Sequence, residues 1–237
     1  MASVIRRIFF GTALILVLVL LVASPLLIRS FIYHPFTIPS GAMKPTLFIG
    51  DYIFVSKSRY GYSRFSVSFS PNLFSGRIMA SLPERGDVVV FRLPRDTSID
   101  YVHRLIGLPG ERIQMISGHL HINGQPVKRE QIEDFVETED GRATRTKRWR
   151  ETLPNGVSHQ TLDAIENGFY DNTPVYTVPA GHYFMMGDNR DNSSDSRVMS
   201  QVGFVPFENL IGRADLIFFS IDPNSGIREE RIGIRIR

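Results

Sequence analysis

Residues 85–91, RGDVVVF, and residues 100–111, DYVHRLIGLPGE, decide the fold that we expect for this 237-residue chain. Each joins a run of β-branched, aliphatic or aromatic residues to a glycine or proline, which is typical of a short strand that ends in a turn. Similar patterns predict strands at 51–57, 87–91, 101–106, 112–115, 119–122, 183–186 and 214–221. Asn123-Gly124 predicts a tight hairpin turn. We therefore expect a mostly β fold.

The composition of the chain changes in its middle part. Residues 117–179 are more polar and richer in turn residues than their flanks, which indicates an inserted smaller β subdomain. Residues 29–116 and 180–237 would then form the core β domain and carry the functional site. No segment after residue 30 shows sustained helical periodicity, although residues 162–167 could form a short helix.

The N-terminus carries a candidate transmembrane segment. Residues 8–28 are 21 positions without a charge, preceded by Arg6 and Arg7. That is long enough for a helix to cross a bilayer, and longer than the apolar part of a cleavable signal peptide. The two arginines favour a cytoplasmic N-terminus at residues 1–7 and an extracytoplasmic main domain. We therefore expect a single-pass membrane protein.

The composition excludes several kinds of chemistry. The chain has no cysteine, which removes disulfides, thiolate metal sites and cysteine nucleophiles. The formal net charge of +3 is too small to indicate a nucleic-acid-binding protein. The basic stretch from Arg142 to Arg150, around Trp149, could meet acidic lipid or a polyanion, but we favour a solvated loop. A metal site at His119 and His121 lacks a third ligand in the sequence.

Three polar clusters carry the chemical signal, because each concentrates glycine with serine, aspartate, asparagine or arginine. They are Pro39–Leu47, Arg85–Phe91 with Asp100–Glu111, and Gly187–Arg197. Taken alone, the Gly187–Arg197 cluster is explained by a turn held by its own side chains.

Together, and in this order behind a single apolar segment, the three clusters closely resemble bacterial type I signal peptidase over nearly the whole chain. The resemblance implies a membrane-anchored serine endopeptidase that removes signal peptides from secreted preproteins at the outer face of the inner membrane. It also implies large antiparallel sheets, a Ser/Lys dyad, and no cofactor or metal. The partners would be signal peptides and the lipid bilayer, with no nucleic acid.

The chain departs from this family at both dyad positions. The resemblance places the serine nucleophile at Ala42 and the lysine base at His103. It also implies that Ser40 completes an oxyanion hole and that Ser193 orients the base. The supporting residues that match are Met43, Arg104, Asp188, Asp195 and Arg197, the last two as an expected ion pair.

An alanine methyl cannot attack a carbonyl, so we expect the chain to be deficient in cleavage. Ser40 is too far along the chain to replace the nucleophile, since two extended residues span about 6.5 Å. His103 is either a base, because an imidazole titrates near neutral pH, or a space-filling strand residue. The alternative to an impaired peptidase is a non-catalytic pseudopeptidase that binds signal peptides or a membrane-protein complex. The alanine at position 42 is either a deliberate replacement of serine that traps the enzyme, or the result of natural degeneration of the gene.

Two further expectations concern apolar surfaces. Small side chains, usually alanine, would precede the cut, and the pocket walls are expected around Ile38, Met43, Val90 and Tyr101. A group of apolar residues near the membrane segment either packs in the core or dips into the lipid interface. These are Phe36, Phe65, Phe69, Leu73 and Phe74.

Overall fold

The structure of the protein is a computed structural model that describes residues 21, 33–66, 75–139 and 142–236. The predicted membrane segment, residues 8–28, lies outside these ranges apart from Leu21. Among the described residues, no helix is both long and apolar enough to cross a membrane. Leu21 is helical, and the other helical structure in the described chain consists of three short 3-10 helices, η1 (Arg190–Asn192), η2 (Phe207–Asn209) and η3 (Glu229–Arg231). The expected mostly β fold is confirmed.

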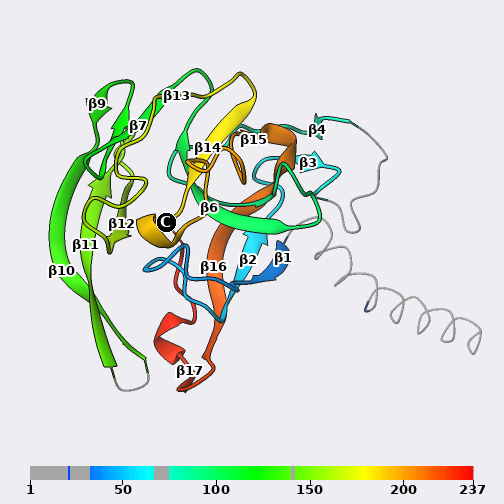
Figure 1. Ribbon diagram of the computed structural model, residues 1–237. Helices are drawn as coiled ribbons and strands as arrows, with labels where there is room; N and C mark the ends of the chain where they lie inside the picture. The colour runs from blue at the N-terminus through cyan, green and yellow to red at the C-terminus, as the bar shows by residue number, and fades with distance from the viewer. Residues whose placement is uncertain (1–20, 22–32, 67–74, 140–141, 237) are drawn as a thin grey trace, which may run out of the picture.

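The largest sheet is antiparallel and runs in the order β1-β2-β16-β5-β6-β14-β15, with β17 paired to β16. Figure 1 shows β16 crossing the centre of this curved sheet beside β2. Its strands are β1 (Tyr33–Thr37), β2 (Asp51–Ser56), β5 (Val88–Arg92), β6 (Asp100–Gly107), β14 (His182–Met186), β15 (Val205–Pro206), β16 (Leu210–Asp222) and β17 (Gly226–Ile227).

The second sheet is dominated by a long hairpin, which projects past one side of the large sheet in Figure 1. It contains β10 (Lys128–Glu139), β11 (Arg142–Thr152) and β12 (Ser158–Asp163), in that order. We call β10 and β11 together the arm. Two smaller sheets contain β13 (Tyr176–Thr177), β7 (Arg112–Ile116), β8 (His119–Ile122) and β9 (Gln125–Pro126), and β3 (Tyr62–Ser63) with β4 (Arg77–Ile78).

The core lies on both faces of the large sheet. Val88 and Val90 of β5 pack into one cluster, whereas Val89 and Phe91 pack into another. Because side chains alternate along a strand, the apolar run is explained by burial of β5 on both faces. A third cluster, around Ile113 and Phe184, joins the large sheet to β7 and β8.

The strand register brings two of the polar clusters together. Arg104 of β6 pairs with Val88 of β5 on one side and with Met186 of β14 on the other. The loop that follows β14 therefore emerges beside residues 103 and 104.

The sequence predicted each of its seven strands within a few residues of the observed limits. The hairpin turn is confirmed, because Asn123 and Gly124 both have positive φ between β8 and β9. The short helix expected at 162–167 was wrong. Leu162 instead pairs with Arg148 within the second sheet. The backbone after β12 turns, and Asp191 accepts hydrogen bonds from the N–H groups of residues 164 and 165.

The loop expected at Arg142–Arg150 was also wrong, since these residues form most of β11. The strand is stabilised by cross-strand partners, such as Glu130 opposite Arg150. The guanidinium carbon of Arg129 lies 3.9 Å from the centre of the Trp149 ring. Of the apolar group near the membrane segment, Phe65 is buried and Phe36 packs against the same core cluster. Phe69, Leu73 and Phe74 lie outside the described residues.

A buried carboxylate joins the C-terminus to the large sheet. Asp51 is fully buried and accepts hydrogen bonds from Arg231 Nε and Nη2 at 2.9 and 2.5 Å. It also accepts from Ser220 Oγ and from the N–H of Phe48. Removing one partner of such an ion pair leaves the other charge buried and uncompensated.

We expect Asp51→Asn to lower the free energy of unfolding by about 3 kcal/mol or more. Urea unfolding of the detergent-solubilised protein, followed by the fluorescence of its only tryptophan, Trp149, measures this. Glu166→Gln is the control, because it breaks the exposed ion pair with Lys147 and should leave the midpoint unchanged. Equal effects of the two variants would contradict this account of Asp51.

Candidate functional site

In the turn after β1, two buried anchors follow Ala42. Met43 and Leu47 are fully buried, and the Leu47 N–H donates to the Met43 carbonyl at 2.9 Å. Ser40, two residues before Ala42, is exposed. The side chains of residues 43 and 47 therefore fix the turn on the core, while the segment from 40 to 42 faces outward.

Asn189 holds the turn from the other side. Its N–H donates to the Ala42 carbonyl, and its Nδ2 donates to the Gly41 carbonyl, both at 3.0 Å. Thr46, at the end of the same turn, donates from Oγ1 to Asp188 at 2.5 Å. Three hydrogen bonds between the turn and residues 188 and 189 therefore set the position of residue 42.

A buried ion pair connects that stretch to β6. Arg104 donates from Nε and Nη2 to the two carboxylate oxygens of Asp188, at 2.8 and 2.7 Å. Both side chains are at most 1% exposed. Burial alone would raise the pKa of the Asp188 carboxyl, but Arg104 holds it below its ordinary value. Asp188 is therefore an anion at neutral pH.

His103 lies next to Arg104 on β6 and meets the loop after β14. Its Nε2 is 3.2 Å from Ser193 Oγ. The imidazole is buried, and its Nδ1 has no hydrogen-bond partner among the described residues. The structure thus places Ser193 and His103 in contact.

Gly187 makes room for these residues to meet. A Cβ added there would lie 2.2 Å from Ser193 Oγ and 2.6 Å from the Ala42 carbonyl oxygen. Both distances are far below normal contact, so any side chain at residue 187 would push the two apart. The structure thus brings Ala42, Ser193 and His103 into one site.

The expected ion pair between Asp195 and Arg197 is present. Arg197 Nε and Nη2 lie 2.9 and 2.8 Å from the Asp195 carboxylate, which also accepts from the N–H of Gly187. Burial opposes ionisation of Asp195, but Arg197 keeps the pKa of this carboxyl below its ordinary value. The pair lies inside the loop and shapes it around Gly187.

Burial makes His103 a weak base. The pKa of the imidazole is lowered to about 4, mainly by desolvation. The charges of Asp195 and Asp188 act to raise this pKa and that of Arg197 acts to lower it, but burial outweighs them. The ring is therefore neutral at pH 7. It can accept a proton only with a driving force much smaller than that of a free imidazole.

The structure separates the four residues expected to wall the substrate pocket. Ile38, Met43 and Val90 belong to one core cluster, against which Phe36 and Val102 pack. Tyr101 packs against a different cluster, with its ring centre 5.6 Å from that of His103.

The sequence did not identify the contributions of Asn189, Thr46 and Gly187. Nor did it identify His159, a second buried histidine, whose Nε2 lies 3.7 Å from Glu151 and 3.9 Å from Asp188. Desolvation, followed by Arg104, lowers the pKa of His159 to about 4. The asparagine and glycine lie within a predicted cluster, but their partners are distant in sequence and become visible only in the fold.

One group of carboxylates could in principle hold a cation. Oxygens of Asp163, Asp171 and Asp191 lie within 4.8 Å of one another. Each residue already has a hydrogen-bond partner: Arg129 for Asp163, the Gly168 N–H for Asp171 and the Ala164 N–H for Asp191. This trio takes no part in the contacts between Ala42, His103 and Ser193.

The chain is similar to proteins of known family. The family model described as "Signal peptidase, peptidase S26" matches residues 9–219. The signal peptidase I of Rickettsia typhi is 48% identical over 203 residues, which cover 82% of this chain and 75% of the relative. That of Rickettsia canadensis is 48% identical over 207 residues, covering 84% and 76%.

Among solved structures, a signal peptidase I from Enterococcus faecalis is 29% identical and covers 56% of this chain and 97% of its own, with a TM-score of 0.32. The family model covers most of the chain, and the two Rickettsia relatives are nearly half identical to it over more than four fifths of its length. The chain belongs to the signal peptidase family, peptidase S26.

Proposed function

We propose that this chain is a membrane-anchored signal peptidase relative that binds polypeptides carrying a signal peptide but does not cut them at a useful rate. One observation carries the proposal: residue 42 is alanine, where the family resemblance places the serine nucleophile. Peptide-bond cleavage by this family's chemistry begins with attack of that oxygen on the scissile carbonyl. The methyl group of Ala42 offers no such oxygen.

Among the described residues, neither Ser193 nor Ser40 is well placed to replace the missing oxygen. The Ser193 hydroxyl lies at the site, but it belongs to a residue only 6% exposed and is engaged with His103. Ser40 is exposed but two residues away along the turn. A nucleophile must come within about 3.5 Å of the carbonyl carbon, and the burial of Ser193 opposes such an approach by a substrate.

The surroundings of residue 103 suit a lysine better than a histidine. Burial that lowers the pKa of an imidazole to about 4 acts in the same direction on an amine. A lysine base needs this, because its ordinary pKa near 10.4 would leave it protonated at pH 7. For a histidine, whose ordinary pKa is already close to 7, the same burial only weakens the base.

The features that would bind a peptide remain. Ile38, Met43 and Val90 form a buried apolar cluster beside residue 42. The partly buried side chains of Phe36 on β1 and Val102 on β6 pack against this cluster and provide apolar surface. Small apolar side chains before the cut, which the family resemblance implies, are compatible with such a surface. Binding and catalysis use different groups, so loss of the nucleophile does not require loss of binding.

The proposed location follows from the apolar segment. Residues 8–28 would span the cytoplasmic membrane once, with Arg6 and Arg7 inside and the β domain on the extracytoplasmic side. The family match begins at residue 9 and so includes this segment. The bilayer and the signal peptides of preproteins are the proposed partners.

We expect the chain to give no turnover of a preprotein substrate above the buffer rate. Ala42→Ser should add little, because the His103 base is weak. Ala42→Ser combined with His103→Lys should exceed Ala42→Ser alone by roughly 100-fold, since a well-placed general base contributes about 10²–10⁴-fold. Timed mass spectrometry of the product, with the full-length protein in detergent, measures these rates.

The controls separate the possible sources of activity. Turnover by the native chain clearly above the buffer rate would overturn the proposal. A large gain in Ala42→Ser alone would show that His103 is an adequate base. If the native chain is active, Ser193→Ala shows whether the Ser193 hydroxyl is the source.

The two buried histidines also predict how stability depends on pH. Their folded pKa of about 4 lies below the unfolded value near 6.5, so between these values only the unfolded chain binds the protons. Stability is therefore unaffected above pH 6.5 and falls as the pH drops toward 4, by up to about 3 kcal/mol for each histidine.

Urea unfolding at pH 7.5 and 5 measures this loss. His159→Gln should remove a substantial part of it, since neither ring nitrogen of His159 has a hydrogen-bond partner among the described residues. His182→Gln, at a half-buried position, is the control and should retain the native slope. An identical pH dependence in native and His159→Gln proteins would refute this assignment.

A further inference from the structure

A polar cleft lies beside Gly41, between the turn that carries Ala42 and the arm. Its volume is about 440 Å³, which is within the usual range of ligand sites. Phe135, Glu137, Thr144 and Thr146 contribute its wall on the arm. Phe135 pairs with Thr146 and Glu137 with Thr144, so all four side chains lie on one face of the hairpin.

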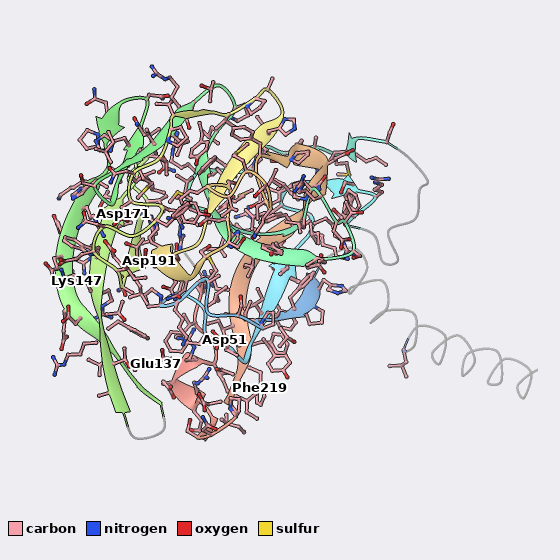
Figure 2. All side chains as sticks on the ribbon, in the orientation of Figure 1. Asp51, Glu137, Lys147, Asp171, Asp191 and Phe219 are labelled. Carbon is pink, nitrogen blue, oxygen red and sulfur yellow. The ribbon has the colours of Figure 1, made fainter. Side chains whose placement is uncertain are left out.

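Two contacts hold the arm against the turn. Lys44 Nζ is 2.5 Å from Glu137 Oε1, and the ring of Phe48 meets that of Phe135 edge to face with centres 5.9 Å apart. Figure 2 shows Glu137 on the arm. Lys44 is 13% exposed and Glu137 37% exposed, so the pair closes the cleft but remains within reach of solvent.

The cleft and the buried apolar cluster of the large sheet lie on opposite sides of the turn. Ile38 and Met43 point into the core of the large sheet, whereas Gly41 and Lys44 line the cleft. Asn189, whose N–H and Nδ2 hold the carbonyls of Ala42 and Gly41, lines the cleft as well. A polypeptide that crosses residue 42 from the partly buried surface of Phe36 and Val102 would therefore continue into the cleft.

The chemistry of the walls suits a polar segment. Thr144, Thr146, Asn189 and Asn192 offer hydroxyl and amide groups, which can bond to peptide backbone and to uncharged polar side chains. Lys44 and Glu137 are its oppositely charged groups. An apolar signal sequence would leave these groups unpaired, whereas the polar residues after an Ala-x-Ala motif would satisfy them.

We propose that this cleft binds the residues that follow the Ala-x-Ala motif of the bound polypeptide, and that the Lys44–Glu137 pair selects among them by charge. The proposal rests on the peptide-binding function proposed above. An acidic residue in the cleft competes with Glu137 for Lys44, and a basic residue competes with Lys44 for Glu137. The intact pair therefore favours an uncharged segment.

The test uses fluorescein-labelled peptides and the full-length protein in detergent, with affinity measured by fluorescence anisotropy. One peptide ends at Ala-x-Ala as an amide. Three others continue for four residues that are uncharged and polar, contain an aspartate, or contain a lysine. We expect the uncharged extension to improve affinity at least about five-fold over the short peptide.

Charge variants then show whether the extension reaches the pair. Glu137→Gln should shift the preference toward the aspartate peptide over the lysine peptide by about three- to five-fold, and Lys44→Met should shift it the other way. The exchange Lys44→Glu with Glu137→Lys restores a pair and should return the preference toward the native value. Glu166→Gln, on an exposed pair of the second sheet, should change nothing.

The outcomes distinguish failure of the cleft proposal from failure of the peptide-binding function. If the short peptide binds as tightly as the extended one, the cleft is not a subsite, but the peptide-binding function stands. If the extension helps but no variant alters the charge preference, the extension lies elsewhere and the cleft proposal is wrong. If no peptide binds the native protein, the peptide-binding function fails, and the cleft proposal fails with it.

Discussion

The buried ion pair between Arg104 and Asp188 is the interaction on which the rest of the site depends. Asp188 accepts two hydrogen bonds from Arg104 and one from Thr46, so it joins β6 to the turn after β1. Its neighbour Asn189 holds the carbonyls of residues 41 and 42. The neighbour of Arg104 is His103. Residues 103 and 104 on β6, together with residues 188 and 189 in the loop after β14, thus determine where positions 42 and 103 lie.

This framework does not depend on the reacting groups. None of its hydrogen bonds involves the side chain of residue 42, and the bonds to that residue use its backbone. An alanine at position 42 therefore leaves the turn in place, with Met43 buried behind it and Gly187 close in front. The physical reason for expecting binding without cleavage is that the fold positions the turn through the backbone, while the chemistry would require a side chain that this chain lacks.

The sequence predicted those parts of the fold that depend on local pattern. The Val88–Val90 run indicated a strand, and Asn123-Gly124 indicated a hairpin turn. The arm was not predicted, because its strands are rich in charged residues and are stabilised by partners on the opposite strand or on the turn, such as Lys44 for Glu137. Its basic residues resemble a solvated loop when the partners are unknown.

The sequence likewise predicted only part of the site. Family resemblance indicated positions 42, 103 and 193, and the fold brings these three together. The electrostatic state of His103 could not be predicted, because an imidazole in a strand has no assigned environment until the packing is known. Asn189 and His159 act through partners far away in sequence, which no local pattern specifies.

Binding without cleavage is the central claim, and one measurement tests both parts of it. The full-length protein in detergent is incubated for a day with a peptide that spans an Ala-x-Ala motif. It is then separated from free peptide, and the bound material is weighed by mass spectrometry. The account predicts that peptide co-elutes with the protein and has its original mass. Recovery of shortened fragments at the Ala-x-Ala motif, or of no peptide at all, would contradict it.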